Sequence, residues 1–302
     1  MKKVLTLCAI FCATLTAILG FPDHAMAWGP GVHLAIGQTA LANLHLFPAV
    51  LAENLLRHSS AFLYGCLSAD IFIGKGTRFK PGHSHNWETG LKLLKSAHDP
   101  RTKAYARGYL THLAADVVAH NYFVPNMLWN MPYGGNAGHV YVEMQADLKT
   151  DWCPNEALRL FRTPSRRQEG ALLSATAQRR WTFLIKKRLM MGSLNLCTRK
   201  SWDHSLGIAG RMQPWPQAGT YLDDMVDLAT RAAMDVLACP EDAATRAFDP
   251  IGSRNLDKVR GLRTKRLRRR KTNTILFSPA AQLCTLPPVY SSANRYARAQ
   301  GQ

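Results

Sequence analysis

Apolar residues recur at steps of three and four along most of the chain. That spacing gathers them on one face of an α-helix, and Gly- and Pro-rich stretches at 72–84 and 130–138 interrupt it. We find no stretch in which apolar and polar residues alternate between hairpin turns, and no internal repeat. The chain is therefore predicted to be all-α, with helical segments at 34–44, 49–67, 87–97, 103–123, 138–152, 168–190 and 220–238.

The first 27 residues have the character of a secretory signal peptide (1–27). Lys2 and Lys3 precede an apolar stretch over 4–21, and Ala25-Met26-Ala27 is a small-x-small cleavage signal. A membrane anchor would need about 20 unbroken apolar residues and no cleavage signal. We therefore expect a secreted or periplasmic protein whose mature chain begins at Trp28.

Basic residues are in excess and unevenly distributed. The chain has 38 Lys and Arg against 20 Asp and Glu, a formal net charge of +18, which favours polyanionic partners such as phospholipid headgroups or nucleic acid. Near residue 250 the composition changes to a basic run over 254–271 and then to Pro and Ser. We expect a helical domain over 28–250 and a basic, partly disordered C-terminal tail over 251–302. This tail is either simply solvated or an electrostatic anchor for an anionic membrane, in which each basic residue would contribute about 1 kcal/mol.

Five cysteines follow residue 27, and none are spaced as Cys-x2-Cys. This argues against a structural zinc site of the finger type. An oxidising compartment would permit up to two disulfides. Cys66 stands in an apolar segment and is interpreted as a core residue.

One segment inside the apolar pattern carries three polar residues at four-residue steps. His112, Asp116 and His120 lie in "HLAADVVAH", and at about 100° per residue they share one helix face. A His and an Asp one turn apart are often only a hydrogen-bonded pair. Three such residues are more typical of a metal site, because a buried carboxylate costs several kcal/mol unless it is paired or bound to a metal.

A second segment, "HVYVEMQAD", repeats this spacing with His139, Glu143 and Asp147. Two such helices facing each other can supply ligands from both sides, as in the metal sites of helix bundles. Imidazole and carboxylate without thiolate suit a catalytic zinc, whereas iron and manganese carboxylate sites favour a Glu-x-x-His spacing that is absent here. Asp147 either hydrogen-bonds to a ligating His or faces solvent.

The cleavage signal adds a further metal-binding candidate. If the chain is cut after Ala27, the free amine and the carbonyl of Trp28 form a chelate, and His33 follows within "WGPGVH". Taken alone, Trp28 is an ordinary buried aromatic. Together with the two helices, it indicates an N-terminal metal ligand.

These segments together resemble the zinc-dependent phospholipase C and single-strand nuclease superfamily, all-α phosphodiesterases with three zinc ions and a mature N-terminal Trp. The resemblance covers about residues 28–150. It is carried by "AMA" before "WGPGVH", "SADIF", "HSHNWETG", "HLAADVVAH" and "HVYVE". The Asp116-x3-His120 spacing is shorter than in the secreted bacterial phospholipases and fungal nucleases. It is similar to the phospholipase C/D-like branch that acts on glycosylphosphatidylinositol anchors, so it leaves the substrate open.

The resemblance implies up to three zinc ions, with Asp116 shared between the first two. His85 is preferred to His83 because it adjoins the helix that begins near Trp87. The implied ligands are Asp70, His83 or His85, His112 and Asp116 for the first zinc, Asp116, Trp28 and His33 for the second, and His120, His139 and Glu143 for the third.

The implied activity is phospholipase C-type hydrolysis of a phospholipid headgroup phosphodiester by a zinc-activated hydroxide. Asp116 would bridge two metal ions, and Asp70 would serve as a ligand or as general base. A single-strand nuclease of the same superfamily is an alternative, because the basic charge suits either polyanion. A non-catalytic protein that keeps zinc for folding is the alternative outside the enzymes.

Overall fold

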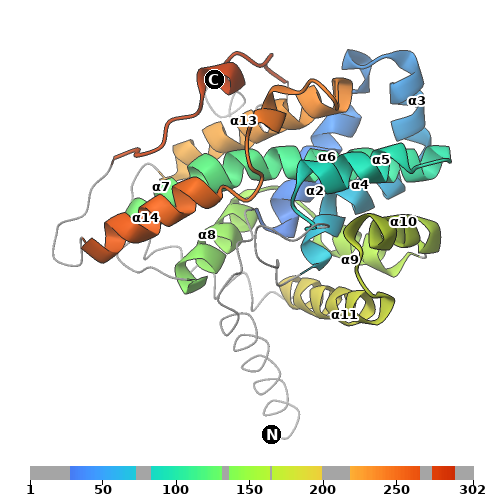
Figure 1. Cartoon of the computed structure of the whole chain (residues 1–302), viewed down its shortest axis with the longest axis horizontal. Coiled ribbons are helices and arrows are strands. Elements are labelled where there is room, and N and C mark those ends of the chain that lie inside the picture. Colours follow the sequence, from blue (N-terminus) through green and yellow to red (C-terminus); the bar gives the residue numbers. More distant parts are fainter. Residues whose placement is uncertain are drawn as a thin grey trace, which may run out of the picture.

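Helices make up the regular structure of the protein (Figure 1). The computed structural model describes residues 28–72, 83–130, 136–163, 165–198, 218–265 and 274–289. No strand occurs in these ranges, which confirms the all-α prediction. Within the same ranges, none of the helices combines the length and the apolar character needed to cross a bilayer.

The helices and short turns follow one another along the chain. The helices are α2 (Pro30–Ala42), α3 (Ala49–Arg57), α4 (Ser59–Ser68), α5 (Trp87–Lys95), α6 (Pro100–Val118), α7 (Val124–Asn130), α8 (Asn136–Lys149), α9 (Pro154–Arg162), α10 (Arg166–Thr176), α11 (Arg180–Cys197), α13 (Ala218–Ala238), α14 (Ser253–Lys265) and α15 (Ala281–Cys284). The turns are η1 (Leu44–Leu46), η2 (Ala69–Ile71), the π-helical η3 (Ala119–Phe123) and η4 (Ala244–Ala247).

Helix α6 is the centre of the fold. Asp99 caps its first turn by accepting hydrogen bonds from the backbone N–H and the hydroxyl of Thr102, at 2.9 and 2.8 Å, and Pro100 stands where the helix needs no N–H. Because α4, α5 and α13 pack around α6 (Figure 1), nearly all of its side chains after the first turn are buried. The polar residues of its later turns, Thr111, His112 and Asp116, therefore lie in the interior.

Two glycines allow α4 and α6 to pack with their backbones almost in contact. A Cβ atom at Gly65 would overlap the Tyr105 carbonyl, and a Cβ atom at Gly108 would overlap the Phe62 carbonyl. Any other residue would push the helices apart. This close approach brings turn η2, directly after α4, against the polar face of α6.

Three predicted helical segments are interrupted in the structure. Segment 49–67 is divided at His58 into α3 and α4, and segment 168–190 is divided after α10, where Ala177 adopts a left-handed conformation (φ 51°). In segment 103–123, α6 ends at Val118 and the wider π turn η3 follows. Such turns are frequent at functional sites.

The described part of residues 251–302 packs onto the helical body. Helix α14 contacts η3 and α7. The first twelve residues of the basic run, 254–265, belong to this helix. Farther along, the buried Asn126 accepts hydrogen bonds from the backbone N–H groups of Leu276 and Phe277, at 2.7 and 3.0 Å. The division at residue 250 stays a prediction, but residues 253–265 and 274–289 are contiguous in space with the helices before them.

Candidate metal centre

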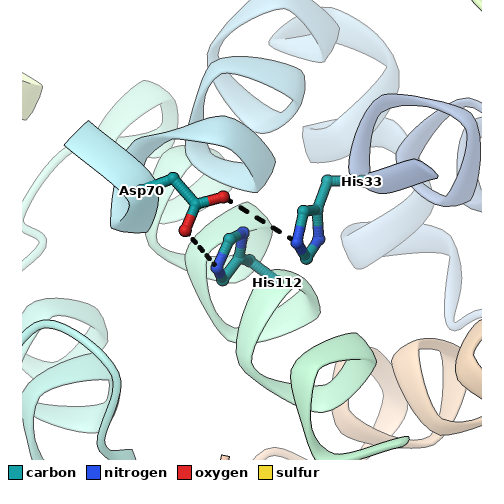
Figure 2. Close-up of side chains that lie close together, drawn as sticks. All are labelled: His33, Asp70 and His112. Atoms are coloured by element: carbon teal, nitrogen blue, oxygen red, sulfur yellow. Dashed lines mark ion pairs between the residues drawn. The ribbon is translucent and has the colours of Figure 1, made fainter. Parts of the chain in front are cut away.

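Separate segments of the chain bring six polar side chains together in the interior. None of the six is more than 4% exposed. They are His33 on α2, Asp70 on η2, His85 before α5, His112 and Asp116 on α6, and His120 on η3. Figure 2 shows His33, Asp70 and His112 turned toward one another.

Asp116 is the centre of this cluster. Its Oδ1 lies 3.3 Å from His33 Nε2, and its Oδ2 lies 3.3 Å from the Nε2 atoms of His85 and His112. His120 Nε2 is 3.9 Å from the same Oδ2. One carboxylate thus faces four imidazoles, an arrangement that suits a ligand shared between metal ions.

Asp70 faces the same imidazoles from η2. Its Oδ1 is 3.2 Å from His85 Nε2 and 3.7 Å from His112 Nε2, and its Oδ2 is 4.0 Å from His33 Nε2. Ligand atoms of His33, Asp70 and His112 all lie within 4.8 Å of one another, as do those of His85, His112 and Asp116. These two groups share His112, so the cluster offers adjoining sets of donors.

Four atoms of the cluster that could bind a metal have no hydrogen-bond partner among the described residues. Both ring nitrogens of His33 and both carboxylate oxygens of Asp116 are buried, and none of the described residues gives them a hydrogen bond of good geometry. A buried carboxylate without hydrogen bonds costs several kcal/mol. These atoms therefore fit metal ligation, and a set of imidazole nitrogens and carboxylate oxygens without thiolate fits zinc.

Burial and neighbouring charges control protonation in the cluster. Burial opposes ionisation of Asp116, but His112 and His33 outweigh it and hold the pKa of Asp116 well below its usual range. Burial also opposes ionisation of Asp70, yet His112, His85 and His33 lower the pKa of Asp70. Burial, together with His112, lowers the pKa of His33. Ionised carboxylates and a neutral imidazole are the forms that bind a metal.

Hydrogen-bond partners at Nδ1 hold the rings of His112 and His85 in place. His112 Nδ1 is 2.8 Å from the Cys66 carbonyl oxygen, and His85 Nδ1 is 2.8 Å from the Ser84 hydroxyl. The Tyr109 hydroxyl in turn donates a hydrogen bond to the Ser84 carbonyl. Both rings consequently turn Nε2 toward the carboxylates, as the hydrogen-bond partners of metal ligands commonly do.

The two histidines of "HSHNWETG" lie in different surroundings. His85 belongs to the cluster, whereas Nδ1 of His83 accepts a hydrogen bond from the His85 backbone N–H at 3.0 Å. The two ring centroids are 6.2 Å apart. This geometry favours His85 as the ligand and gives His83 a role in shaping the turn.

Trp28 is fully buried beside the cluster. Its indole N–H donates a hydrogen bond to the Ala115 carbonyl at 3.0 Å, and its ring stacks on Phe123 with a centroid separation of 4.6 Å. The indole therefore anchors the segment before α2 to α6 and η3. Ligation by the Trp28 amine stays a prediction, because residues 1–27 lie outside the described part of the chain.

The predicted ligands His139 and Glu143 are on α8, which packs against α2 and α7. Their side chains lie outside the described residues. Their assignment to a third zinc with His120 stays a prediction.

Asp147 has a different role from those that the sequence suggested. Its carboxylate accepts hydrogen bonds from the backbone N–H groups of Gly31 and Val32, both at 3.0 Å. Burial raises the pKa of Asp147 to about 7, against the effect of these two donors. Asp147 therefore holds the first turn of α2, where N–H groups are otherwise unsatisfied, and so positions His33. The four-residue step from Glu143 indicated only its helix face.

Gly252 is a further residue of the site that the sequence analysis missed. It has a positive φ of 60°, and a Cβ atom there would overlap the His120 carbonyl and lie 2.6 Å from the His120 Cβ. The chain thus needs glycine at this position to pass against the turn that carries His120. A Gly just before a helical segment was the only sequence signal, and it is common at helix starts.

The fold and the site define an all-α protein with a buried centre of histidine and carboxylate ligands. Comparison with protein families is more specific: residues 32–191, a little over half of the chain, match the model described as zinc dependent phospholipase C. The chain belongs to the zinc-dependent phospholipase C family, which confirms the resemblance seen in the sequence. Neither the comparison with curated proteins nor that with solved structures gave a match. The narrower branch suggested by the Asp116-x3-His120 spacing stays a prediction.

Proposed function

We propose that this chain is a secreted zinc-dependent phosphodiesterase that hydrolyses the headgroup phosphodiester of a phospholipid, as a phospholipase C does. The observation that supports this function best is the buried Asp116 carboxylate, which faces several imidazoles and makes no hydrogen bond among the described residues. Membership of the family supports a phospholipid-hydrolysing zinc enzyme. Secretion is proposed from the leader-like sequence of residues 1–27.

His33, His85 and His112, with Asp70 and Asp116, would hold zinc in this enzyme. Trp28, His120, His139 and Glu143 would complete the set that the family resemblance implies. Bound zinc would supply Lewis-acid chemistry, polarising a phosphoryl oxygen and making water more acidic.

The protein's own contribution is to hold the metal-binding side chains in position before zinc binds. The Cys66 carbonyl and the Ser84 hydroxyl orient two imidazoles before any ligand binds, so little ordering is left to occur on binding. The carboxylates of Asp70 and Asp116 are buried in the surrounding core. Asp70, which reaches the cluster from η2, would orient the substrate water as well as bind metal.

Zinc content and phospholipid hydrolysis test this proposal together. The chain should be purified after export and compared with Asp116→Asn and with the matched control Asp242→Asn, since Asp242 is exposed and far along the sequence from the cluster. We expect zinc in the wild type and the control, and release of diacylglycerol and a phosphorylated headgroup from phosphatidylcholine. Asp116→Asn should lose both properties while it keeps its helical circular dichroism.

Two results would reject the phospholipase. Cleavage of single-stranded DNA without release of diacylglycerol would make the chain a nuclease. Zinc-dependent thermal stability without either activity would make it a protein that binds zinc for folding.

A further inference from the structure

Helix α11 exposes a row of large apolar side chains. They stand at steps of three and four, so they share one helix face. The row, named here the α11 stripe, consists of Trp181, Leu184, Ile185 and Leu189, which are 60%, 39%, 48% and 52% exposed. The opposite face of α11 is also apolar, but Phe183, Met190 and Leu194 on it are buried.

Contacts of Lys187 fix the rotation of α11 about its own axis, so that the α11 stripe faces outward. Lys187 forms an ion pair with Glu169 on α10, and its Nζ lies 5.2 Å from the centre of the Tyr64 ring on α4. The Tyr64 hydroxyl donates a hydrogen bond to the same Glu169 at 2.9 Å. A rotation of α11 that buried the stripe would break these contacts and expose Phe183.

The part of the chain that carries the α11 stripe, residues 157–198, is strongly basic. Between residues 157 and 198 the only acidic residue is Glu169, which is paired with Lys187, whereas nine residues are basic. The basic residues are Arg159, Arg162, Arg166, Arg167, Arg179, Arg180, Lys186, Lys187 and Arg188. Arg180 and Arg188 are exposed on α11 itself. An exposed apolar helix face accompanied by exposed arginines is a pattern of helices that lie in the interface of an anionic membrane.

Helix α11 also lies next to the metal centre. Phe183, on its inner face, contacts Phe72 with a ring-centroid distance of 5.8 Å, and Phe72 follows the cluster residue Asp70 by two positions. α11 packs on η2 and on α9, and Figure 1 shows it at the edge of the molecule beside α9. A bilayer on the outer face of α11 would therefore lie about one helix diameter, roughly 10 Å, from the turn that holds Asp70.

We propose that the α11 stripe and its flanking arginines bind the surface of an anionic phospholipid bilayer. The apolar side chains would enter the boundary between headgroups and acyl chains while Arg180 and Arg188 contact lipid phosphates. A second copy of the chain is a poorer occupant, because two such faces in contact would bring like charges together. The inference rests on the proposed function only in that the bound lipid would also be the substrate.

Vesicle binding by matched variants tests this surface. The stripe variant carries Trp181→Ser, Ile185→Ser and Leu189→Ser together. The control variant carries Leu46→Ser, Val50→Ser and Leu56→Ser, because these apolar residues on η1 and α3 are also more than half exposed (53%, 82% and 66%). Zinc-loaded proteins are mixed on ice with phosphatidylglycerol–phosphatidylcholine vesicles or with pure phosphatidylcholine vesicles, and binding is measured by flotation. Diacylglycerol is measured in the same samples, so that binding is scored on intact lipid.

We expect the stripe variant to bind anionic vesicles about tenfold more weakly or worse, and the control variant to bind like the wild type. Arg180→Gln with Arg188→Gln should weaken binding to anionic vesicles by about fivefold per residue at low salt, since a basic residue near an anionic surface contributes about 1 kcal/mol. This charge variant should bind pure phosphatidylcholine as the wild type does. All variants change exposed positions, so circular dichroism and thermal unfolding should be unaltered.

Equal vesicle binding by the stripe and control variants would overturn the inference. So would a change of oligomeric state in light scattering without a change in vesicle binding, which would make the stripe a contact between copies. Hydrolysis of a short-chain phosphatidylcholine, supplied as monomers, separates this failure from a failure of the proposed function. If the stripe variant cleaves the monomers normally but not vesicles, both proposals hold. If the wild type binds vesicles through the stripe but cleaves neither substrate, the surface stands and the phospholipase does not.

Discussion

Replacement of Gly252 by alanine measures how closely the C-terminal region is packed against the metal centre. An alanine at φ 60° costs about 1–2 kcal/mol in backbone conformation. The added methyl group would also overlap the His120 backbone, and such overpacking costs about 1–3 kcal/mol. The two effects together predict that Gly252→Ala lowers the free energy of unfolding by about 2–5 kcal/mol.

Thermal unfolding followed by circular dichroism checks this magnitude. In a chain of this size 1 kcal/mol corresponds to about 2–4 °C, so the midpoint should fall by roughly 4–20 °C. Gly261→Ala is the matched control: it lies on the following helix α14, and nothing lies within 4 Å of an added Cβ atom. This control should be neutral or stabilised by up to about 1 kcal/mol.

Bound zinc, measured on the same samples, shows whether the close packing of Gly252 against the His120 backbone also positions the His120 side chain. Zinc per chain should fall in Gly252→Ala and stay constant in Gly261→Ala. An unchanged midpoint in Gly252→Ala would refute the reasoning, because the left-handed conformation and the overlap with His120 would then cost nothing.

Three further substitutions test other parts of the fold and site. Gly108→Ala should destabilise the chain by about 3 kcal/mol in denaturant unfolding because its Cβ would overlap α4, whereas Gly170→Ala, with open space around it, should not. His85→Ala should reduce the zinc content measured by mass spectrometry, and His83→Ala should reduce it less, because only His85 faces Asp70 and Asp116; the opposite ranking would overturn the assignment. Asp147→Ala should lower the free energy of unfolding by about 1–3 kcal/mol, since two N–H groups of α2 lose their acceptor. An unaltered midpoint in thermal unfolding would contradict the role of Asp147 in holding the first turn of α2.

The polar residues of α6 show what periodicity can predict. A constant four-residue step is a local property of the helix, so it placed His112 and Asp116 on one face correctly. Their partners, His33 and Asp70, come from distant segments, and spacing alone gave no information about which of these would meet α6. The family resemblance supplied that pairing, and the structure brings His33 to 3.3 Å and Asp70 to 3.7 Å from the α6 residues.

Contacts made through backbone atoms were beyond the sequence analysis. Asp147 binds N–H groups of another helix, and Gly252 is required by the position of another residue's backbone. Neither relation leaves a periodic signal. The basic run illustrates a different difficulty: its charge suggested either a solvated tail or a membrane anchor, and gave no sign that Asn255 donates a hydrogen bond to the Asn121 carbonyl at 2.8 Å and so joins α14 to η3. Tertiary contacts thus override the local charge.

The outward face of α11 and the buried cluster follow from the same helical pattern. In both places the period of the helix is kept while the type of residue is reversed: polar side chains enter the core on α6, and apolar side chains face solvent on α11. Each reversal is unfavourable in an isolated globular chain, because buried carboxylates and exposed large apolar side chains both cost free energy. Metal ions would remove the first cost and a lipid surface would remove the second. The contact between Phe72 and Phe183 joins α11 to the segment that carries Asp70, so a bound bilayer and the metal centre would be held at a fixed separation. In the proposed enzyme, this separation would keep the headgroup phosphodiesters of a bound bilayer at a constant distance from the cluster.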